Sequence, residues 1–290
     1  MPIRIPRTSL TTWLTSAAVT GALVAGTLAV TSQDSDAAAP SATTAVSPDV
    51  PVTVVAEPST EGLEAISTSA RFAVSVSDDE TGAGTTYGDG AFDTASVVKV
   101  DILAALLHRH QEAGTSMTSA ERALASAMIE HSDNDAATAL YRSVGGESGL
   151  EGFNASIGLT GTDVGPDGLW GLTTTTTTDQ VRLLRVVLGD ATVLDDDSQA
   201  YARSLMSAVE ADQRFGVSAA ADDASAAVLK VGFLQRSTTG LWDVTSIGEV
   251  VAQGHTYLVA VLTDGNATYA DGVALADEVA RAAVEAVSAI

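Results

Sequence analysis

The strand-like runs of this sequence lie near its two ends and leave a long helical middle between them, an order that few folds can accommodate. The early runs are "RFAVSVSDD" and "TTYGD", joined by the turn-rich "ETGAG". The late runs are "AAVLKVGFLQ", "GLWDVTSIGEVVAQ" and "HTYLVAVLTDG". Short runs of this kind, separated by Gly-rich turns, are typical of antiparallel strands. We therefore predict an α+β fold in which both chain ends build one antiparallel sheet, with a last helix from about Ala276 packed on it.

The middle of the chain predicts an all-helical lobe over about residues 96–215. Residues 97–113 are apolar on nearly every face, so we expect this helix to be buried. Thr118 and Glu121 have the spacing of a capping box and predict a second helix. "HSDN" interrupts the helical pattern, which resumes in "DAATALYRSV" and ends at two glycines. This link can present polar side chains to a cleft between lobe and sheet.

A run of six threonines precedes another predicted helix, "QVRLLRVVLG". We expect the run to end as an N-cap, in which Thr178 or Asp179 accepts hydrogen bonds from free backbone N–H groups. A further helix is predicted over about residues 198–210. No internal repeat is visible.

The N-terminal residues have the composition of an export signal and a tether. Arg4 and Arg7 precede an apolar stretch over residues 13–30, and "DAAAPS" offers small residues for cleavage near Ala39. We predict a signal peptide over residues 1–39, a flexible linker over 40–60 and a folded domain over 61–290. A membrane anchor made by residues 13–30 is the alternative to secretion.

Composition excludes several kinds of function. The chain has no cysteine, which rules out disulfides, thiolate metal sites and cysteine nucleophiles. Its formal net charge is −23, so nucleic acid is not expected as a partner. Neither a metal nor an organic cofactor is implied, and the oligomeric state is open.

Lysine is scarce in this chain, whose basic residues are otherwise arginines. Only Lys99 and Lys230 are present, and lysine differs from arginine in that burial or a nearby cation can remove its proton. Ser96 stands three residues before Lys99 at the start of the buried helix, so the two side chains share one helix face, about 5–6 Å apart at Cβ. A neutral Lys99 can then accept the proton of Ser96.

Two further groups of residues fit the same chemistry. Ser132 and Asn134 are alternate residues of the tight link, where a hydroxyl can relay a proton and a carboxamide can hold a substrate amide. Lys230 and Gly232 share one face of a strand, where the glycine lets a substrate lie close to the backbone. The lysine adds a cation that can lower the pKa of Lys99.

The three motifs S-x-x-K, S-D-N and K-x-G, in this order, resemble the penicillin-recognising serine hydrolases, and class A β-lactamases most of all. The resemblance covers about residues 60–290 and implies a β-lactamase/transpeptidase-like fold with a five-stranded sheet and the active site in the cleft. It implies the following roles: Ser96 as nucleophile, Lys99 as its base, Ser132 as proton relay, Asn134 as substrate ligand, Lys230 as electrostatic anchor, and the N–H groups of Ser96 and Phe233 as oxyanion hole. Gly232 would lie along the substrate. Arg214 is a candidate partner for a substrate carboxylate, and a surface salt bridge is the alternative for this residue.

Two departures from the family pattern leave the activity open. The resemblance implies a glutamate in an E-x-x-L-N loop that activates the deacylating water, but no such motif stands between Asn134 and Thr173. The loop here is "GLTGTDVGPDGLWG", whose acids are Asp163 and Asp167, and we expect both to be solvated. Val231 replaces the usual hydroxyl residue of the third motif. Three functions remain: a secreted β-lactamase-like hydrolase, a D-alanyl-D-alanine carboxypeptidase or penicillin-binding protein acting on cell-wall peptides, and a relative that binds without turnover.

Overall fold

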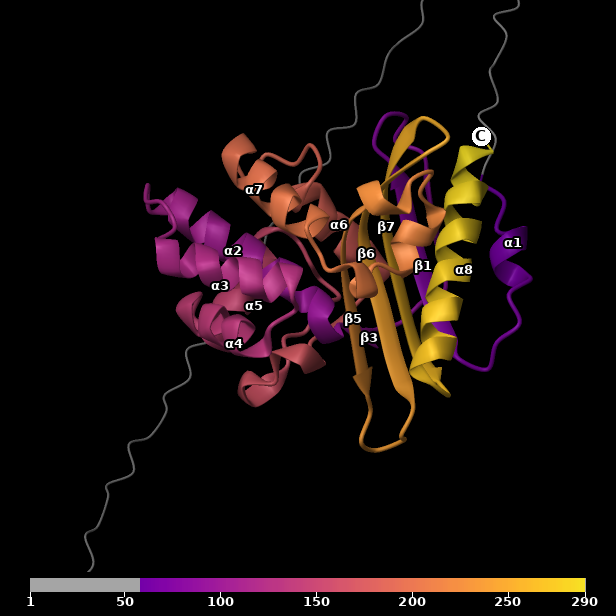
Figure 1. The fold of residues 1–290 in the computed structure, drawn as a ribbon, viewed down its shortest axis with the longest axis horizontal. Coiled ribbons are helices and arrows are strands. Elements are labelled where there is room, and N and C mark those ends of the chain that lie inside the picture. Colours follow the sequence, from indigo (N-terminus) through magenta and orange to yellow (C-terminus); the bar gives the residue numbers. More distant parts are fainter. Residues whose placement is uncertain (1–57, 290) are drawn as a thin grey trace, which may run out of the picture. The chain divides into compact units, whose positions relative to one another are not determined.

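The computed structural model of the protein describes residues 58–289, and a five-stranded antiparallel sheet is its centre. The strand order is β2-β1-β7-β6-β5, so two early strands pair directly with three late ones. Figure 1 shows β5 at the sheet edge that faces the helical lobe. The strands are β1 (Arg71–Asp78), β2 (Gly84–Tyr87), β5 (Val228–Gln235), β6 (Trp242–Ala252) and β7 (His255–Asn266). The predicted sheet is confirmed.

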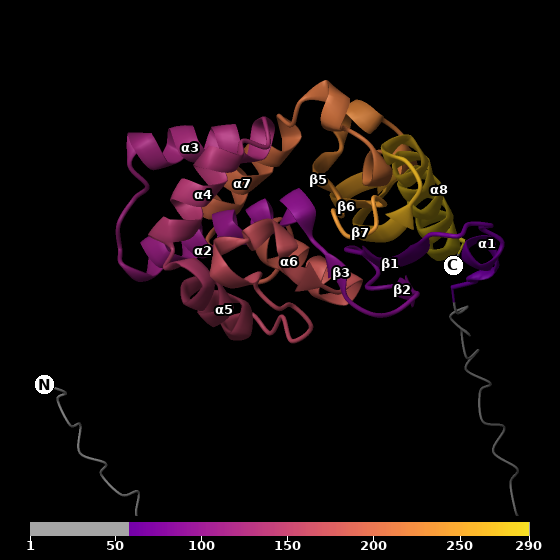
Figure 2. The same cartoon turned by 90° about the horizontal axis from the view of Figure 1, so that it is seen from below.

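Helices cover both faces of this sheet, which explains why its central strands are apolar on both sides. On one face lies α8 (Tyr269–Ser288), with α1 (Glu61–Glu64) packed against it. On the other face α6 (Thr177–Val187) contacts β1 and β7 (Figures 1 and 2). Residues 257–262 of β7, between these layers, are all buried.

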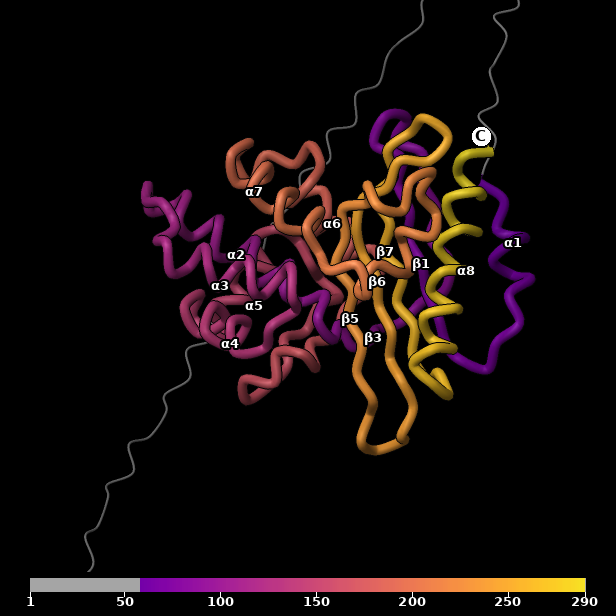
Figure 3. Tube along the Cα trace, in the orientation of Figure 1, coloured from indigo at the N-terminus to yellow at the C-terminus, as the bar shows by residue number. Residues whose placement is uncertain are grey.

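The helical lobe surrounds α2 (Val98–Glu112), which is buried at ten consecutive residues from Val98 to Leu107. A short 3-10 turn, Ala95–Val97, leads into it. The tube in Figure 3 follows the chain from the indigo strands through this lobe and back to the sheet. The remaining helices of the lobe are α3 (Ser119–Glu130), α4 (Asn134–Ser143), α5 (Gly146–Ser156) and α7 (Asp196–Ser207).

Several helix ends differ from the sequence predictions. The last helix begins at Tyr269 rather than near Ala276, because Thr268 caps it by accepting a hydrogen bond from the Asp271 backbone N–H. Thr176, and not Thr178 or Asp179, caps α6. The capping box at Thr118 and Glu121 is confirmed.

One helix and two short strands around the helical lobe were not predicted. Helix α5 follows the two glycines at once, and the short strands β3 (Phe92–Asp93) and β4 (Thr174–Thr175) pair beside the start of α2. Part of the threonine run therefore forms a strand, and this strand lies next to the segment that carries Ser96.

The predicted signal peptide over residues 1–39, the alternative anchor over 13–30 and most of the predicted linker lie outside the described residues. Within residues 58–289, no helix is both long and apolar enough to cross a membrane. The boundaries of the signal, the linker and the domain over 61–290 stay predictions.

Candidate active site

Ser96 lies in the 3-10 turn that joins β3 to α2, and the backbone there is strained. Ala95 has a φ of 47°, in the left-handed region that residues with a side chain rarely adopt. Such a conformation costs on the order of 1 kcal/mol and is often found at active sites. Ser96 is half-buried, and its neighbours Ala95 and Val97 are buried. The turn therefore presents one hydroxyl group at an otherwise apolar surface.

Lys99 is fully buried and meets three of the predicted residues at once. Its Nζ lies 3.0 Å from Ser96 Oγ, 3.0 Å from Ser132 Oγ and 2.8 Å from Asn134 Oδ1. The Ser132 carbonyl oxygen is a fourth acceptor at 2.6 Å. An ammonium has three protons for these four acceptors, so the contacts compete for them. One amine thus links the first two motifs.

Lys230 reaches the same hydroxyl group from β5. Its Nζ donates to Ser132 Oγ at 3.1 Å and to the Val231 carbonyl oxygen at 2.9 Å. Ser132 has a φ of 55°, a second strained position in the cluster. Because both amines donate to Ser132 Oγ, the two lysines of the chain meet at one oxygen atom.

Both ammonium groups lose their protons more readily than a free lysine does. Burial lowers the pKa of Lys99 to about 8, although the charge of Asp133 opposes this shift. Burial and the repulsion of Lys99 lower the pKa of Lys230 to about 7. Repulsion between like charges is mutual, so we treat the lysines as one coupled pair that loses its first proton near neutral pH. Of the two amines, Lys99 is the one that contacts Ser96 Oγ. Its position therefore favours Lys99 over Lys230 as the base that accepts the Ser96 proton.

Gly232 brings β5 against the Ser96 turn, and only glycine fits there. A Cβ atom at this position would lie 2.6 Å from the Ser96 backbone nitrogen and 2.7 Å from the Thr94 carbonyl oxygen. Thr245 holds the two segments together, since its Oγ1 lies 3.0 Å from the Thr94 carbonyl oxygen and 3.2 Å from that of Gly232. The next residue, Phe233, lines the same pocket as Ser96. The two backbone N–H groups predicted to form an oxyanion hole thus belong to adjoining segments.

Comparison with known protein families identifies the chain. Residues 110–287, more than half of its length, match the Beta-lactamase enzyme family. The chain belongs to this family. The match includes Ser132, Asn134, Lys230 and Gly232 but begins after Ser96 and Lys99. A comparison with curated proteins gives no match.

Solved structures with the same fold are class A β-lactamases and a related protein. A class A β-lactamase from Bacteroides cellulosilyticus DSM 14838 has a TM-score of 0.66 at 17% identity and covers 76% of this chain and 93% of its own. A mutant of PBP-A, in an acyl-enzyme complex with penicillin G, has a TM-score of 0.65 at 20% identity over 76% and 91%. A variant of the last common ancestor of Gram-negative bacteria β-lactamase class A has a TM-score of 0.60 at 26% identity over 75% and 92%. The predicted resemblance and fold are confirmed.

Arg214 is not part of the lysine cluster. Its guanidinium group donates to the carbonyl oxygens of Ser207, Val209, Ala224, Ser225 and Ala227. These contacts fix the segment between α7 and β5 and leave little donor capacity for a substrate carboxylate. They argue against the predicted role of Arg214.

The two loop acids also lie apart from the pocket that contains Ser96. Asp163 and Asp167 are exposed, and neither lines this pocket. Asp163 pairs with Thr174 through the backbone, and Asp167 occupies a turn with a φ of 56°. Neither carboxylate therefore belongs to the lining of the pocket that would receive a group bound at Ser96.

Trp170 lies in the site although it was not predicted to do so. Its ring centroid lies 5.2 Å from Lys99 Nζ, and its Nε1 donates to Thr138 Oγ1 at 3.2 Å. A ring face so close to an ammonium stabilises the charged form. The indole also occupies space beside Lys99 that water would otherwise fill. The sequence feature that could have indicated its role is that Trp170 is a large aromatic residue within a Gly-rich loop.

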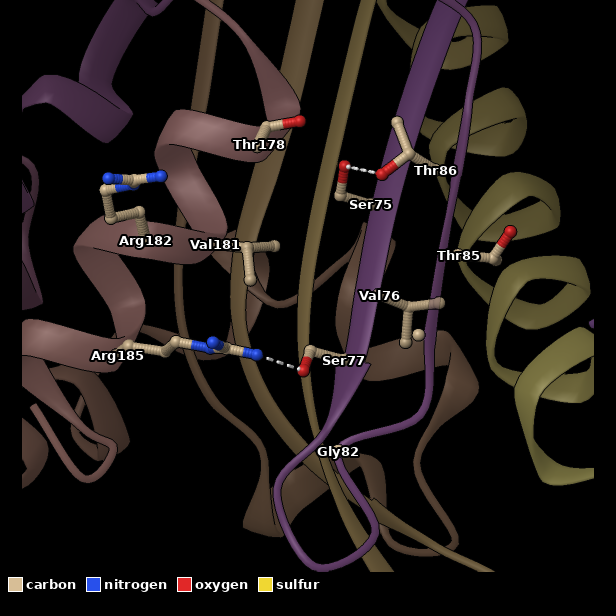
Figure 4. A pocket seen from close by; sticks show the side chains of 11 residues that line it. Ser75, Val76, Ser77, Gly82, Thr85, Thr86, Thr178, Val181, Arg182 and Arg185 are labelled. Atoms are coloured by element: carbon tan, nitrogen blue, oxygen red, sulfur yellow. Dashed lines mark hydrogen bonds between the residues drawn. The ribbon is translucent and has the colours of Figure 1, made fainter. Parts of the chain in front are cut away.

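A separate cavity, shown in Figure 4, contains none of the predicted residues. It lies between α6 and the β1–β2 hairpin, where Arg185 donates to Ser77 Oγ at 2.7 Å and Ser75 and Thr86 share a hydrogen bond of 2.9 Å. Among residues 58–289, no group of three or more acidic or histidine side chains is arranged to hold a metal ion.

Proposed function

We propose that the protein is a secreted serine hydrolase, similar to class A β-lactamases, that opens a β-lactam or a related amide through an acyl-enzyme on Ser96. One observation carries this proposal. Lys99 Nζ lies 3.0 Å from the Oγ atoms of both Ser96 and Ser132, and its pKa is lowered to about 8. A base that is partly neutral at physiological pH thus contacts both the nucleophile and the proposed proton relay.

The reaction follows from these contacts. Ser96 Oγ attacks the amide carbon while its proton passes to Lys99, and a C–O bond forms as the carbonyl π electrons move to oxygen. The oxyanion accepts hydrogen bonds from the N–H groups of Ser96 and Phe233. The C–N bond then breaks, and the leaving nitrogen takes a proton delivered from Lys99 through Ser132. In a β-lactam the nitrogen stays attached through the opened ring, so the adduct keeps every atom of the substrate.

Asn134 and Lys230 support this step in different ways. We assign Asn134 to the substrate amide, although its Oδ1 is bonded to Lys99 in the free protein and has to exchange partners. Lys230 Nζ lies 3.1 Å from Ser132 Oγ and, while it is protonated, places a second positive charge beside the proposed proton relay.

Hydrolysis of the acyl-enzyme is expected to be slow. The chain lacks the family's E-x-x-L-N glutamate, and Trp170 lies over Lys99 where a water would need to approach. This weakens the β-lactamase hypothesis without selecting between the alternatives, of which one is a D-alanyl-D-alanine carboxypeptidase or penicillin-binding protein. The similarity to PBP-A, whose mutant is known as an acyl-enzyme with penicillin G, agrees with that alternative. A relative that binds without turnover is the third possibility.

The decisive experiment is intact-mass analysis of the protein during incubation with benzylpenicillin. We expect an adduct with the full mass of the drug that forms in stoichiometric amount and disappears slowly. A rapidly lost adduct would indicate a true β-lactamase, and the absence of any adduct would contradict the proposal.

Two substitutions and a control assign the adduct. Ser96→Ala should abolish it, whereas Ser204→Ala, on the exposed face of α7, should not change it. Lys99→Arg keeps the charge but cannot act as a base, and we expect acylation to slow by about 10²–10⁴-fold. Normal labelling of Ser96→Ala would reject the nucleophile, and near-normal labelling of Lys99→Arg would reject the base.

A further inference from the structure

Exposed apolar side chains gather around Ser96. Within residues 58–289, five large apolar side chains are exposed, and three of them line the pocket that contains Ser96. These three are Leu169, Leu172 and Phe233, which are 54%, 37% and 43% exposed. Single exposed apolar residues are common, but a group of them in one concavity marks a binding site.

The pocket has a volume of about 350 Å³ and no charged lining. Loop residues 168–172 form one wall, the end of β5 at Phe233 and Leu234 forms the other, and Ala95, Ser96 and Asn134 complete it. The indole N–H of Trp170 is already bonded to Thr138, so this side chain turns an apolar ring to the pocket. Ser96 and Asn134 are left as the polar side chains available to a ligand.

The loop wall is held in place by its own backbone. The N–H groups of Leu169, Leu172 and Thr173 donate to the carbonyl oxygens of Pro166, Leu169 and Trp170, respectively. Thr173 Oγ1 in turn accepts from the backbone N–H of Gly165 at 3.0 Å. The two leucines therefore project from a braced turn and are available to a ligand without a rearrangement of the chain.

Cations that could receive an anionic substrate are engaged elsewhere. Arg214 donates to backbone carbonyls, and Arg236 forms an ion pair with Asp93. Lys99 and Lys230 are buried behind Ser96 and do not line the pocket. A charged acyl group would lose its hydration here without gaining a partner.

We propose that this pocket binds an uncharged, apolar acyl chain on the carbonyl group that Ser96 attacks, so that the preferred substrates are esters or amides of such acyl groups. This inference rests on the proposed role of Ser96 as nucleophile and adds the class of acyl group that it accepts. Each buried methylene stabilises the transition state by about 0.8 kcal/mol, which corresponds to about a fourfold increase in kcat/KM. Selectivity should therefore rise steadily with chain length until the pocket is filled.

Aryl esters test this selectivity directly. In p-nitrophenyl esters Ser96 Oγ attacks the carbonyl carbon. The ester C–O bond then breaks, and p-nitrophenolate leaves with the bonding electrons. The serine proton stays on Lys99 or passes to the phenolate. Water later splits the acyl-enzyme to the free acid and restores Ser96. Because phenolate is released at acylation, its first turnover reports kcat/KM even where deacylation is slow.

We would compare the acetate, butyrate and hexanoate esters with the monoester of adipic acid, which matches hexanoate in length but ends in a carboxylate. After subtraction of the rate with Ser96→Ala, we expect about a fifteenfold gain from acetate to butyrate and a further gain to hexanoate. The adipate ester should react at least tenfold more slowly than hexanoate. A flat series, or equal rates for adipate and hexanoate, would overturn the proposal.

The chain offers a matched control for the pocket wall. Leu172→Gln and Leu169→Gln should flatten the chain-length series, whereas Leu241→Gln should leave it unchanged. Leu241 is exposed to the same 37% as Leu172 but lines a different cavity. Thermal unfolding of each variant checks its fold, and equal effects of Leu172→Gln and Leu241→Gln would contradict the assignment.

Penicillin labelling separates this inference from the proposed function. If Ser96 forms the penicillin adduct but no ester releases phenolate, or the series is flat, the apolar acyl pocket is wrong and the nucleophile stands. If neither reagent reacts at Ser96, the proposed function fails and the inference fails with it.

Discussion

Asp101 lies on α2 two residues after Lys99, and its carboxyl group is fully buried without a cationic partner. Burial raises its pKa to about 7 from an ordinary 3.8, and the nearby Asn154 amide lowers it only in part. The alignment of that pair is poor, since Asp101 Oδ1 and both polar atoms of Asn154 lack a hydrogen-bond partner. We therefore predict that Asp101→Asn stabilises the protein in a strongly pH-dependent way.

The magnitude follows from the change in pKa. The folded state holds a proton on Asp101 up to about pH 7, whereas the unfolded chain releases it near pH 3.8. Folding is therefore penalised as the pH rises above 3.8, and the full penalty is present above 7. A shift of this size corresponds to about 4 kcal/mol at pH 8 and to about 0.5 kcal/mol at pH 4. An asparagine carries no charge in either state and removes this penalty.

Urea unfolding of wild type and Asp101→Asn at pH 4 and pH 8 measures the difference. The effects of all other titrating groups cancel in the comparison, so the gain should be small at pH 4 and approach about 4 kcal/mol at pH 8, or roughly 10 °C in Tm. Asp167→Asn is the control, because Asp167 is exposed and its replacement should act alike at both pH values. An Asp101→Asn gain that is equal at pH 4 and pH 8 would refute the reasoning.

Three further predictions concern the site. The rate of acylation should rise with pH and level off above about pH 8. The reason is that the lysine pair, with pKa values of about 8 and 7, has to lose a proton before Lys99 can accept one. Stopped-flow labelling measures this rate, and a rate that is constant from pH 5 to 9 would contradict the prediction. Gly232→Ala should cost about 1–3 kcal/mol in urea unfolding and abolish labelling, since its Cβ would collide with backbone on two sides. Gly152→Ala, where no atom lies within 4 Å, should be tolerated. Trp170→Ala should admit water beside Lys99 and so shorten the lifetime of the penicillin adduct in the mass assay, whereas Trp170→Phe should preserve that lifetime. Equal adduct lifetimes in Trp170→Ala and the wild type would contradict the idea that Trp170 excludes water.

The fold could be predicted because its periodic patterns are local. Strands at both ends and a helix that is apolar on every face leave few ways to bury the apolar side chains, and the five-stranded sheet is the outcome. The start of α8 was misplaced because residues 269–275 contain Gly272 and Asp271, which weaken the helical pattern, while a single capping bond at Thr268 sets the boundary. Helix α5 was missed for a similar reason, since three of its eleven residues are glycines.

The positions of site residues could be predicted where spacing along the chain determines them. They were harder to predict where tertiary packing determines them. Ser96 and Lys99 share a helical turn, so their contact at 3.0 Å follows from spacing. Arg214 and Trp170 lie in irregular segments, where the sequence has no periodic pattern from which the direction of a side chain could be predicted. Arg214 donates hydrogen bonds to backbone carbonyl oxygens, and Trp170 reaches Lys99 through a turn in which both Asp167 and Gly168 are left-handed.

The scarcity of lysine in this chain agrees with the demands of the proposed chemistry. Several arginines have partners that suit a permanent charge: Arg203 is paired with Glu249, Arg236 with Asp93, and Arg214 with carbonyl oxygens. At Ser132 the protein needs two cations close together, of which one gives up its proton and later returns it. Arginine would stay charged there, and two buried guanidinium groups without a carboxylate would strongly destabilise the fold. Lysine solves this problem because its proton can leave, so that the pair carries less than two charges near neutral pH.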